Sequence, residues 1–509
     1  MYNMRNYKLI FIFFLTFLSS QSQDHTKEIF FRVIDSQSNM PIAYATVQIK
    51  DKNIGIVAND DGSFRIPENY KINNYVLEIS CIGYKTKFVE LKNIVLKQDN
   101  VIKLTPKIEL LDQVVINANT SNGSNNITAV DIVRKAILNI QKNYPLENYS
   151  TVGYYRDYQV INNTYYNLNE AIIESFDYGF KSDIIMDSKN KNVLYEYVEN
   201  SEFSRDPTLI QPYDGFSKYI DDTKISGQGG NELGILNIHN PIRNYEHLSF
   251  SFVYVFKRKF IDNHKFINIK KVYLNDEILY EIDFEAKESL TKSSHKAEGK
   301  IYISKEDYAI HKFSYNVTKK ASLETIFEVV VEYKKTNELM YLNYISFNNQ
   351  FNISDAFKFD VVSVDYDANE KAFYVKFNSK IDQKSIDRKD FKFRYNKKKL
   401  LVEDAELVTD YDVKVTVKGW SLPEIDESTD MSGFTYRIKN IYDISNRKIF
   451  KTQQIKGYQF REYFTQQIFE NKALPNNAQF INKYSPLSEA QIVEKSGVSK
   501  YWLNTPLKR

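Results

Sequence analysis

Six histidines are spread through the 509 residues, and one of them has the spacing of a zinc-ligand pair. His25 and Glu28 stand three residues apart, as two ligand positions of a zinc peptidase do. No third ligand lies nearby, and the chain contains no His-Glu-x-x-His sequence. We therefore predict no metal site and no cofactor.

Three further segments carry residue types used in catalysis, but each lacks part of its motif. Residues 227–230 are rich in glycine, as a dinucleotide-binding fingerprint is. Glu232, however, stands where that fingerprint has its third glycine, so we predict a flexible loop. Residues 215–219 hold a serine but lack the second glycine of a nucleophile elbow. The pair Asp221-Asp222 is interpreted as solvated turn residues, although two carboxylates brought together by folding would suit glycoside hydrolysis. No catalytic residue is predicted.

The thiol and the aromatic residues indicate packing rather than chemistry. The single cysteine, Cys81, excludes an intramolecular disulfide, and its apolar run 76–82 predicts a buried structural thiol. Tyrosine (38) and phenylalanine (34) far outnumber the two tryptophans, Trp420 and Trp502. Because Tyr and Phe suit half-buried sheet faces, we expect them to form β-sheet cores rather than a sugar site.

The length of the chain limits the number of domains, and its net charge limits the kinds of partner. A chain of this length forms about three to four domains, and 42% apolar residues are enough to build their cores. The net charge of +3 gives no basic field, so no nucleic-acid partner is predicted.

Residues 1–22 have the pattern of a secretory signal peptide. Arg5 and Lys8 precede the apolar run 9–18, and small and polar residues follow, with cleavage expected after Ser20 or Ser22. The run is shorter than the roughly 20 residues that span a bilayer, no cysteine follows it for lipid attachment, and no later segment is a transmembrane candidate. We predict an exported protein, periplasmic or peripherally associated with the outer membrane or cell surface.

Residues 24–118 break into short alternating runs separated by turn residues, which predicts a β-sandwich. Between the second and third runs, residues 59–62 (Asn-Asp-Asp-Gly) favour a tight turn. An aspartate pair beside a glycine also occurs in calcium loops, but the remaining oxygen ligands are missing. We therefore predict a turn here.

Four motifs in this region occur in a recognisable order and spacing. They are Phe31-Arg32-Val33-Ile34-Asp35, Met40-Pro41-Ile42-Ala43-Tyr44-Ala45-Thr46-Val47, Asn59-Asp60-Asp61-Gly62-Ser63-Phe64 and Ile79-Ser80-Cys81-Ile82-Gly83-Tyr84. Together they closely resemble the carboxypeptidase regulatory-like domain, which precedes many Bacteroidota outer-membrane receptors and surface proteins. The resemblance implies an immunoglobulin- or transthyretin-like sandwich without catalytic groups, closed by a strand near residues 111–116.

The middle of the chain predicts one helix followed by a long antiparallel sheet. Residues 119–127 read as a polar linker, after which Thr128 caps a helix that ends at Tyr144-Pro145. Residues 128–355 then alternate over many runs, interrupted by an irregular insertion or lid at 184–248. Residues 299–310, with the strand that follows, resemble the curved half-barrels of envelope lipoprotein carriers.

Residues 356–452 predict a second sandwich, and 453–509 a less regular segment with a capped helical stretch near 488–493. The runs 361–364, 372–382, 390–393, 413–417 and 436–443 resemble bacterial immunoglobulin-like domains of surface-layer type. The predicted fold class is therefore mainly β: two sandwiches and a curved antiparallel half-barrel with one helix.

These elements leave three functions open. The first is a noncatalytic envelope protein that binds a lipid, another apolar ligand or an outer-membrane protein; its ligand-binding residues are unknown. The second is a structural scaffold or surface adhesion module whose half-barrel is filled by its own side chains. The third is a hydrolase hidden in residues 184–248, or a peptidase-associated protein. An apolar cavity favours the first, a filled core the second, and clustered histidines and carboxylates the third.

Overall fold

The computed structural model describes residues 28–96, 100–107, 127–182, 189–210, 218–219, 231–246, 256–289, 291, 294–353, 358–419, 431–451, 455–494 and 500–506. Among these described residues, strands account for 52% and helices for 12%, which confirms the predicted mainly-β class. Contacts divide the chain into two compact units, one of residues up to 109 with 273–276 and 502–507, the other of the remainder. The predicted signal peptide (1–22), His25, residues 111–116, Asp221-Asp222, residues 227–230 and Trp420 lie outside the described residues.

The first unit is a sandwich of two small sheets, ordered β4-β1-β7 and β3-β2-β5-β6. Its elements are β1 (Glu28–Asp35), β2 (Thr46–Ile49), β3 (Gly55–Val57), β4 (Ser63–Pro67), α2 (Asn69–Ile72), β5 (Val76–Ser80), β6 (Lys87–Glu90) and β7 (Asn100–Leu104). Alternate residues of β1 are buried, as the alternation of the sequence predicts. β1 pairs antiparallel with β4 and parallel with β7.

The predicted turn at residues 59–62 is confirmed. Gly62 donates its N–H to the carbonyl of Asn59 at 3.0 Å and has a φ of 73°. A Cβ on Gly62 would meet the Val33 carbonyl oxygen at 2.4 Å, so only glycine fits there. The Asp61 carboxylate accepts from the Ser63 backbone N–H at 3.0 Å, and this closes the turn.

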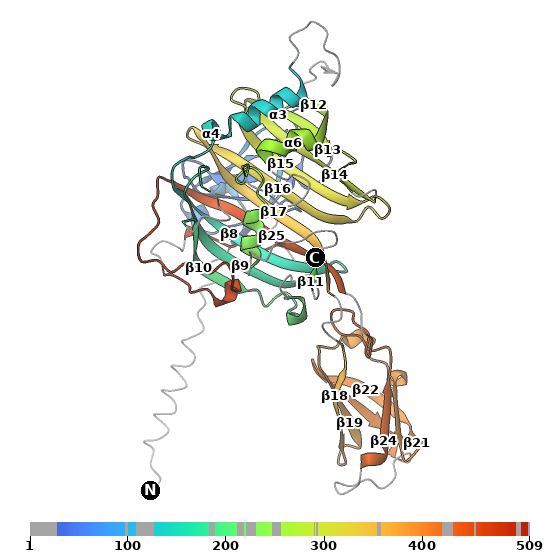
Figure 1. Ribbon diagram of the computed structural model, residues 1–509. Helices are drawn as coiled ribbons and strands as arrows, with labels where there is room; N and C mark the ends of the chain where they lie inside the picture. The colour runs from blue at the N-terminus through green and yellow to red at the C-terminus, as the bar shows by residue number, and fades with distance from the viewer. Residues whose placement is uncertain are drawn as a thin grey trace, which may run out of the picture. The chain divides into compact units, whose positions relative to one another are not determined.

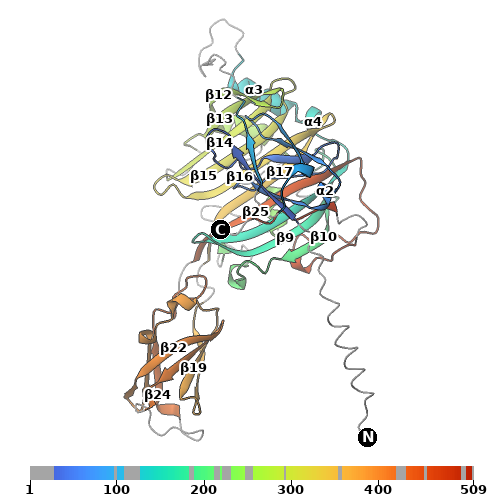
Figure 2. The ribbon, with the colours of Figure 1, turned by 180° about the vertical axis from the view of Figure 1, so that it is seen from behind.

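The second unit contains an 11-stranded sheet in the order β10-β9-β8-β25-β17-β16-β15-β14-β13-β12, with β11 paired to β17 (Figures 1 and 2). Its strands are β8 (Tyr149–Ile161), β9 (Thr164–Asp177), β10 (Lys191–Glu199), β11 (Lys218–Tyr219), β12 (His264–Leu274), β13 (Glu277–Ala286), β14 (His295–Ser304), β15 (Ile310–Lys319), β16 (Thr325–Thr336), β17 (Leu339–Ile353) and β25 (Ile455–Glu470). The long alternating runs of the sequence thus form neighbouring antiparallel strands, as predicted.

Strand β25 lies in the middle of this sheet, between β8 and β17. From the sequence, these residues are predicted to lie in a separate segment, 453–509, because the second sandwich separates them from the other strands. That sandwich has sheets β18-β19-β23-β22 and β21-β20-β24 and is inserted between β17 and β25. Its strands are β18 (Val361–Asp367), β19 (Ala372–Phe377), β20 (Phe391–Tyr395), β21 (Lys398–Leu400), β22 (Val402–Thr409), β23 (Asp412–Val417) and β24 (Phe434–Ile438).

The predicted helix is present as α3 (Ala129–Leu138), continued by α4 (Ile140–Asn143). Thr128 Oγ1 accepts from the Asp131 N–H, and the Asp131 carboxylate accepts from the Thr128 N–H, forming a capping box. Two further helices of the second unit, α5 (Glu232–Ile238) and α6 (Phe256–Asn263), were not predicted, because each spans only about two turns.

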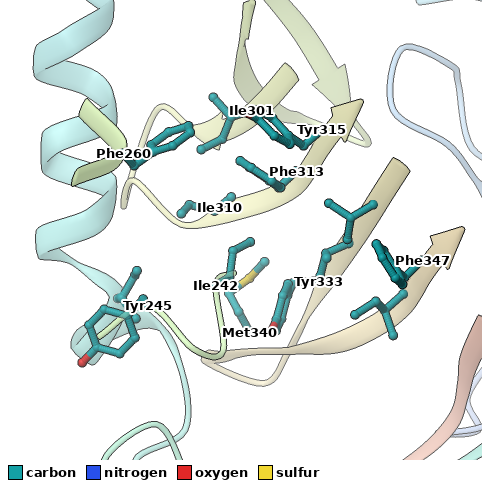
Figure 3. Close-up of a cluster of buried hydrophobic side chains, with 14 of the residues drawn as sticks. Ile242, Tyr245, Phe260, Ile301, Ile310, Phe313, Tyr315, Tyr333, Met340 and Phe347 are labelled. Atoms are coloured by element: carbon teal, nitrogen blue, oxygen red, sulfur yellow. The ribbon is translucent and has the colours of Figure 1, made fainter. Parts of the chain in front are cut away.

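Aromatic side chains fill the sheet surface beneath α3 and α6 (Figure 3). The ring of Phe260 on α6 lies 5.0 Å from that of Phe284 and 5.7 Å from that of Phe313, measured between centroids. Tyr315 continues this stack on β15. Over β13–β15, therefore, the sheet is packed by its own side chains.

The capped helical stretch predicted near residues 488–493 is wrong. Only a 3-10 turn, η8 (Leu487–Glu489), forms there. The residues that follow pair with the edge strand β10 instead, since Val493 donates its N–H to the Leu194 carbonyl at 2.8 Å. The edge strand β10 has backbone N–H and C=O groups on its open side. An extended segment can hydrogen-bond to these groups, whereas a short polar helix cannot.

Candidate functional site

A pocket of about 510 Å³ lies between α5 and the part of the sheet formed by β8, β9, β25, β16 and β17. Residues 190–192 at the start of β10, the loop after α5 at residues 240–243, and the segment 481–484 complete its wall. All of these elements belong to the second unit. Leu233, Tyr333, Ile345 and Tyr463 of its wall belong to the same hydrophobic cluster as the aromatic side chains over β13–β15, so the pocket lies at the border of that core.

The apolar part of the wall comes from α5 and β17. Leu233 and Ile238 project from the helix, and Leu342 and Ile345 from the strand. Three residues apart on a regular strand, Leu342 and Ile345 would point to opposite faces. The pairing of β16 with β17 shifts register here, since Tyr344 opposes Glu332 and Leu342 opposes Tyr333. This bulge turns both side chains toward the pocket.

A buried ion pair forms one end of the pocket. Arg243 Nε and Nη2 donate to Asp177 Oδ2 and Oδ1, both at 2.7 Å, and the two side chains are only 3% and 10% exposed. Arg243 also donates to the carbonyls of Gly179 and Ser182, at 2.9 and 2.8 Å. Burial opposes the charge of Arg243, but the Asp177 carboxylate outweighs it and raises the pKa of the guanidinium above its ordinary value. Asp177 is therefore a structural partner of Arg243.

Tyrosine hydroxyls beside this pair are also satisfied. Tyr149 donates to Asp177 Oδ2 at 3.1 Å, and burial raises the pKa of Tyr149 well above its ordinary value. Tyr463 donates to the Thr151 carbonyl at 3.1 Å. These phenols stay protonated at neutral pH, so they serve as hydrogen-bonding groups rather than as bases.

Asparagines supply much of the remaining polar wall. Asn231 caps α5 by accepting from the Gly234 N–H at 2.8 Å, and its amide donates to the carbonyls of Asn482 and Ser485 at 3.1 and 3.2 Å. Asn240 donates to the Tyr333 hydroxyl at 2.9 Å. Asn231 thereby holds the segment 482–485 against the helix, and Asn192 and Asn237 add further amides to the wall.

The charged residues of the wall are Asp177, Lys191, Arg243 and Lys483. Three cations and one carboxylate leave a net charge of +2, and Asp177 is already engaged by Arg243. The lining contains no histidine or cysteine among the described residues. Such a wall suits a ligand with an apolar part and a polar, acidic part.

A second group of buried polar side chains lies on the sheet outside the pocket wall. Arg461 forms an ion pair with Glu232 and donates to Asn349 Oδ1 at 2.7 Å. Burial, with the nearby Glu232 carboxylate, raises the pKa of Asp157 to about 7. Burial also lowers the pKa of Lys218 to about 8, and its Nζ donates to the Leu209 carbonyl at 3.0 Å. The pKa values of Asp157 and Lys218 are shifted, but the contacts that shift them are structural. None of Arg461, Asp157 and Lys218 lines the pocket.

Some residues that the sequence analysis singled out are now placed. Cys81 is half-buried rather than fully buried, and Trp502 is buried in the first unit against Tyr70. The predicted insertion, 184–248, contributes residues 190–192 and 231–243 to the pocket. Sequence reasoning marked that segment as a lid but did not find Asp177 or Arg243, because their pairing joins positions 66 residues apart.

Comparisons with known proteins bear mainly on the first unit. No curated protein matches the chain. Among solved structures, a LolA superfamily protein from Nitrosomonas europaea matches with 11% identity and a TM-score of 0.18, covering 46% of this chain and 88% of its own. A DUF1329 family protein from Desulfovibrio piger matches with 4% identity and a TM-score of 0.20, covering 43% and 86%. Every helix in the described part of the chain falls short of the length and hydropathy needed to cross a bilayer.

The family model of the CarboxypepD_reg-like domain matches residues 32–116. This range lies within the predicted boundaries 24–118 and contains most of the four motifs. Residues 32–116 therefore form a carboxypeptidase regulatory-like domain, as the sequence indicated.

Proposed function

We propose that this protein binds an amphipathic ligand of the lipid class in the pocket between α5 and the sheet, and that it does so without catalysis. The observation that carries the proposal is the pocket itself. Its volume of about 510 Å³ lies within the ~300–1,000 Å³ typical of small-molecule sites. Leu233, Ile238, Leu342 and Ile345 would contact the apolar part of the ligand, and the asparagines and Lys191 its polar part.

The contrast within one sheet supports binding over a purely structural role. Over β13–β15 the aromatic side chains fill the surface, as a scaffold requires. Next to them lies the open pocket. The side chains that line an empty pocket lose the van der Waals contacts that side chains in a filled core make. A bound ligand would restore that packing, since each Å² of apolar surface removed from water contributes roughly 25 cal/mol.

The chemistry of the wall supports a noncatalytic role. Its one carboxylate among the described lining residues, Asp177, is held by Arg243 and Tyr149. A hydrolase would need a base or nucleophile directed at the ligand. Of the residues within 184–248 that line the pocket, Asn231 instead caps α5 and Arg243 neutralises Asp177.

The location that we propose is the cell envelope, either in the periplasm or on the outer membrane. The support is the signal-peptide pattern of residues 1–22. An apolar or lipid ligand fits that location, as does an outer-membrane protein partner.

Native mass spectrometry of the protein purified gently from its own envelope tests the proposal. We expect added mass that organic extraction removes. The variant Leu342→Trp, which places an indole into the pocket, should lose that mass. Leu407→Trp changes another partly buried strand leucine, in the second sandwich, and should retain it. A bare mass for the unaltered protein, or equal loading of both variants, would contradict binding in this pocket.

A further inference from the structure

Residues 502–506 belong to the first unit, although they lie almost 400 residues after its last strand. They contact the open side of the sandwich, where β4 and β3 are the edge strands of its two sheets. Edge strands carry backbone N–H and C=O groups that no neighbouring strand satisfies. The segment supplies partners for some of these groups.

Asn504 connects the two edges. Its Oδ1 accepts from the backbone N–H of Arg65 on β4 at 3.1 Å, and its Nδ2 donates to the carbonyl of Val57 on β3 at 3.1 Å. The side chain is fully buried. A primary amide has both a donor and an acceptor, so it can bridge two edges as a peptide group would; aspartate lacks the donor and leucine lacks both.

The neighbours of Asn504 are bound as well. Trp502 is 5% exposed, and its ring packs edge-on against Tyr70 of α2, with centroids 5.5 Å apart. The carbonyl of Thr505 accepts from Arg65 Nε at 2.9 Å. Arg65 is held in place by Glu28, at 2.9 Å, and by the ring of Phe30 beneath its guanidinium. Along the segment, the ring contact of Trp502 is thus followed by the side-chain hydrogen bonds of Asn504 and by the backbone hydrogen bond of Thr505.

We propose that this sandwich is a peptide-binding module that recognises an extended Trp-x-Asn segment, and that residues 502–504 occupy the site from within the same chain. The recognition is independent of the lipid pocket. It combines side-chain selection at Trp502 and Asn504 with backbone contacts, as in other peptide sites built on sheet edges. Because the segment is tethered, it competes with free peptide at an effective concentration of the order of millimolar.

The test weakens the binding of the chain's own segment in a full-length variant and then adds that segment as a free peptide. The variant Trp502→Ala/Asn504→Ala is titrated with a fluorescent peptide that has the sequence of residues 501–509, and with the same peptide carrying alanine in place of Asn504. We expect the variant to bind the first peptide and the unaltered chain to bind neither at micromolar concentration. The alanine peptide should bind about tenfold to a hundredfold more weakly, because two buried hydrogen bonds are lost.

Hydrogen exchange of β1 shows whether the sandwich of the double variant is folded during the titration. If β1 is protected and the peptide does not bind, or if the two peptides bind equally, the proposal fails. If β1 loses protection, the single variant Asn504→Ala, which keeps Trp502, is titrated with the same peptides. With β1 protected in that variant, lack of binding even at a peptide concentration of the order of millimolar, which exceeds competition by the weakened segment, or equal binding of the two peptides, would overturn the proposal in the same way.

Discussion

The ion pair between Asp177 and Arg243 is predicted to be the most sensitive point of the pocket. Asp177→Ala removes an acceptor of four hydrogen bonds, two from Arg243, one from Tyr149 and one from the Gly179 N–H at 2.8 Å. It also leaves the guanidinium of Arg243, which is 3% exposed, without its counter-charge. Breaking a buried pair from one side costs about 3–5 kcal/mol, so we expect the second unit to lose about that much stability.

The expected loss of stability comes from the uncompensated charge of Arg243 rather than from the energy of the ion pair itself. A double variant, Asp177→Ala/Arg243→Met, removes both charges and should recover a large part of the loss. The exposed pair Lys181 and Glu147, 3.0 Å apart, provides the control. Glu147→Ala should change stability by under about 1 kcal/mol, because water screens that pair.

Denaturant unfolding combined with hydrogen exchange of β8 and β9 measures these effects where they arise, since the chain has several cores that need not unfold together. A cost below about 1 kcal/mol for Asp177→Ala would refute the reasoning. So would a double variant less stable than the single one, since the orphaned charge would then not be the cause.

Two further predictions concern other parts of the second unit. Asp157, whose pKa is raised to about 7 by burial, stays protonated in the folded state over a range in which the unfolded chain ionises. The contribution of Asp157 to stability should therefore fall by about 1.4 kcal/mol per pH unit between about pH 4 and 7. Asp157→Asn should remove that contribution from the slope measured in denaturant titrations, and an unchanged slope would argue against a protonated Asp157. Thr128→Ala removes the acceptor for the Asp131 N–H and should destabilise α3 by about 1 kcal/mol, whereas Thr128→Ser should restore most of it, as thermal melts would show.

Local patterns account for the parts of the fold that the sequence predicted. The alternation in β1, the turn closed by Gly62 and the cap at Thr128 each depend on residues within a few positions of one another. Their side chains therefore carry the signal whatever the rest of the chain does.

The parts that sequence reasoning missed depend on distant partners. β25 alternates like any strand, but nothing local shows that it pairs with β8, whose residues precede it by about 300 positions. The same holds for Asn504 and Arg65, and for Arg243 and Asp177. Each of these pairings is a contact that only the assembled sheet or sandwich brings about.

The residues that face the sheet from the two short helices explain why a pocket exists at one position and a core at the other. α6 contributes Phe260, a ring large enough to reach Phe284 and Phe313 on two strands. α5 contributes Gly234 and Asn237, which are three residues apart and so share one helix face toward the pocket. A glycine has no side chain to fill space, and the half-buried Asn237 carries an amide that an apolar core would leave without hydrogen-bond partners. A helix with that face suits a site that a ligand fills, and it would be a poor choice for one that the protein fills itself.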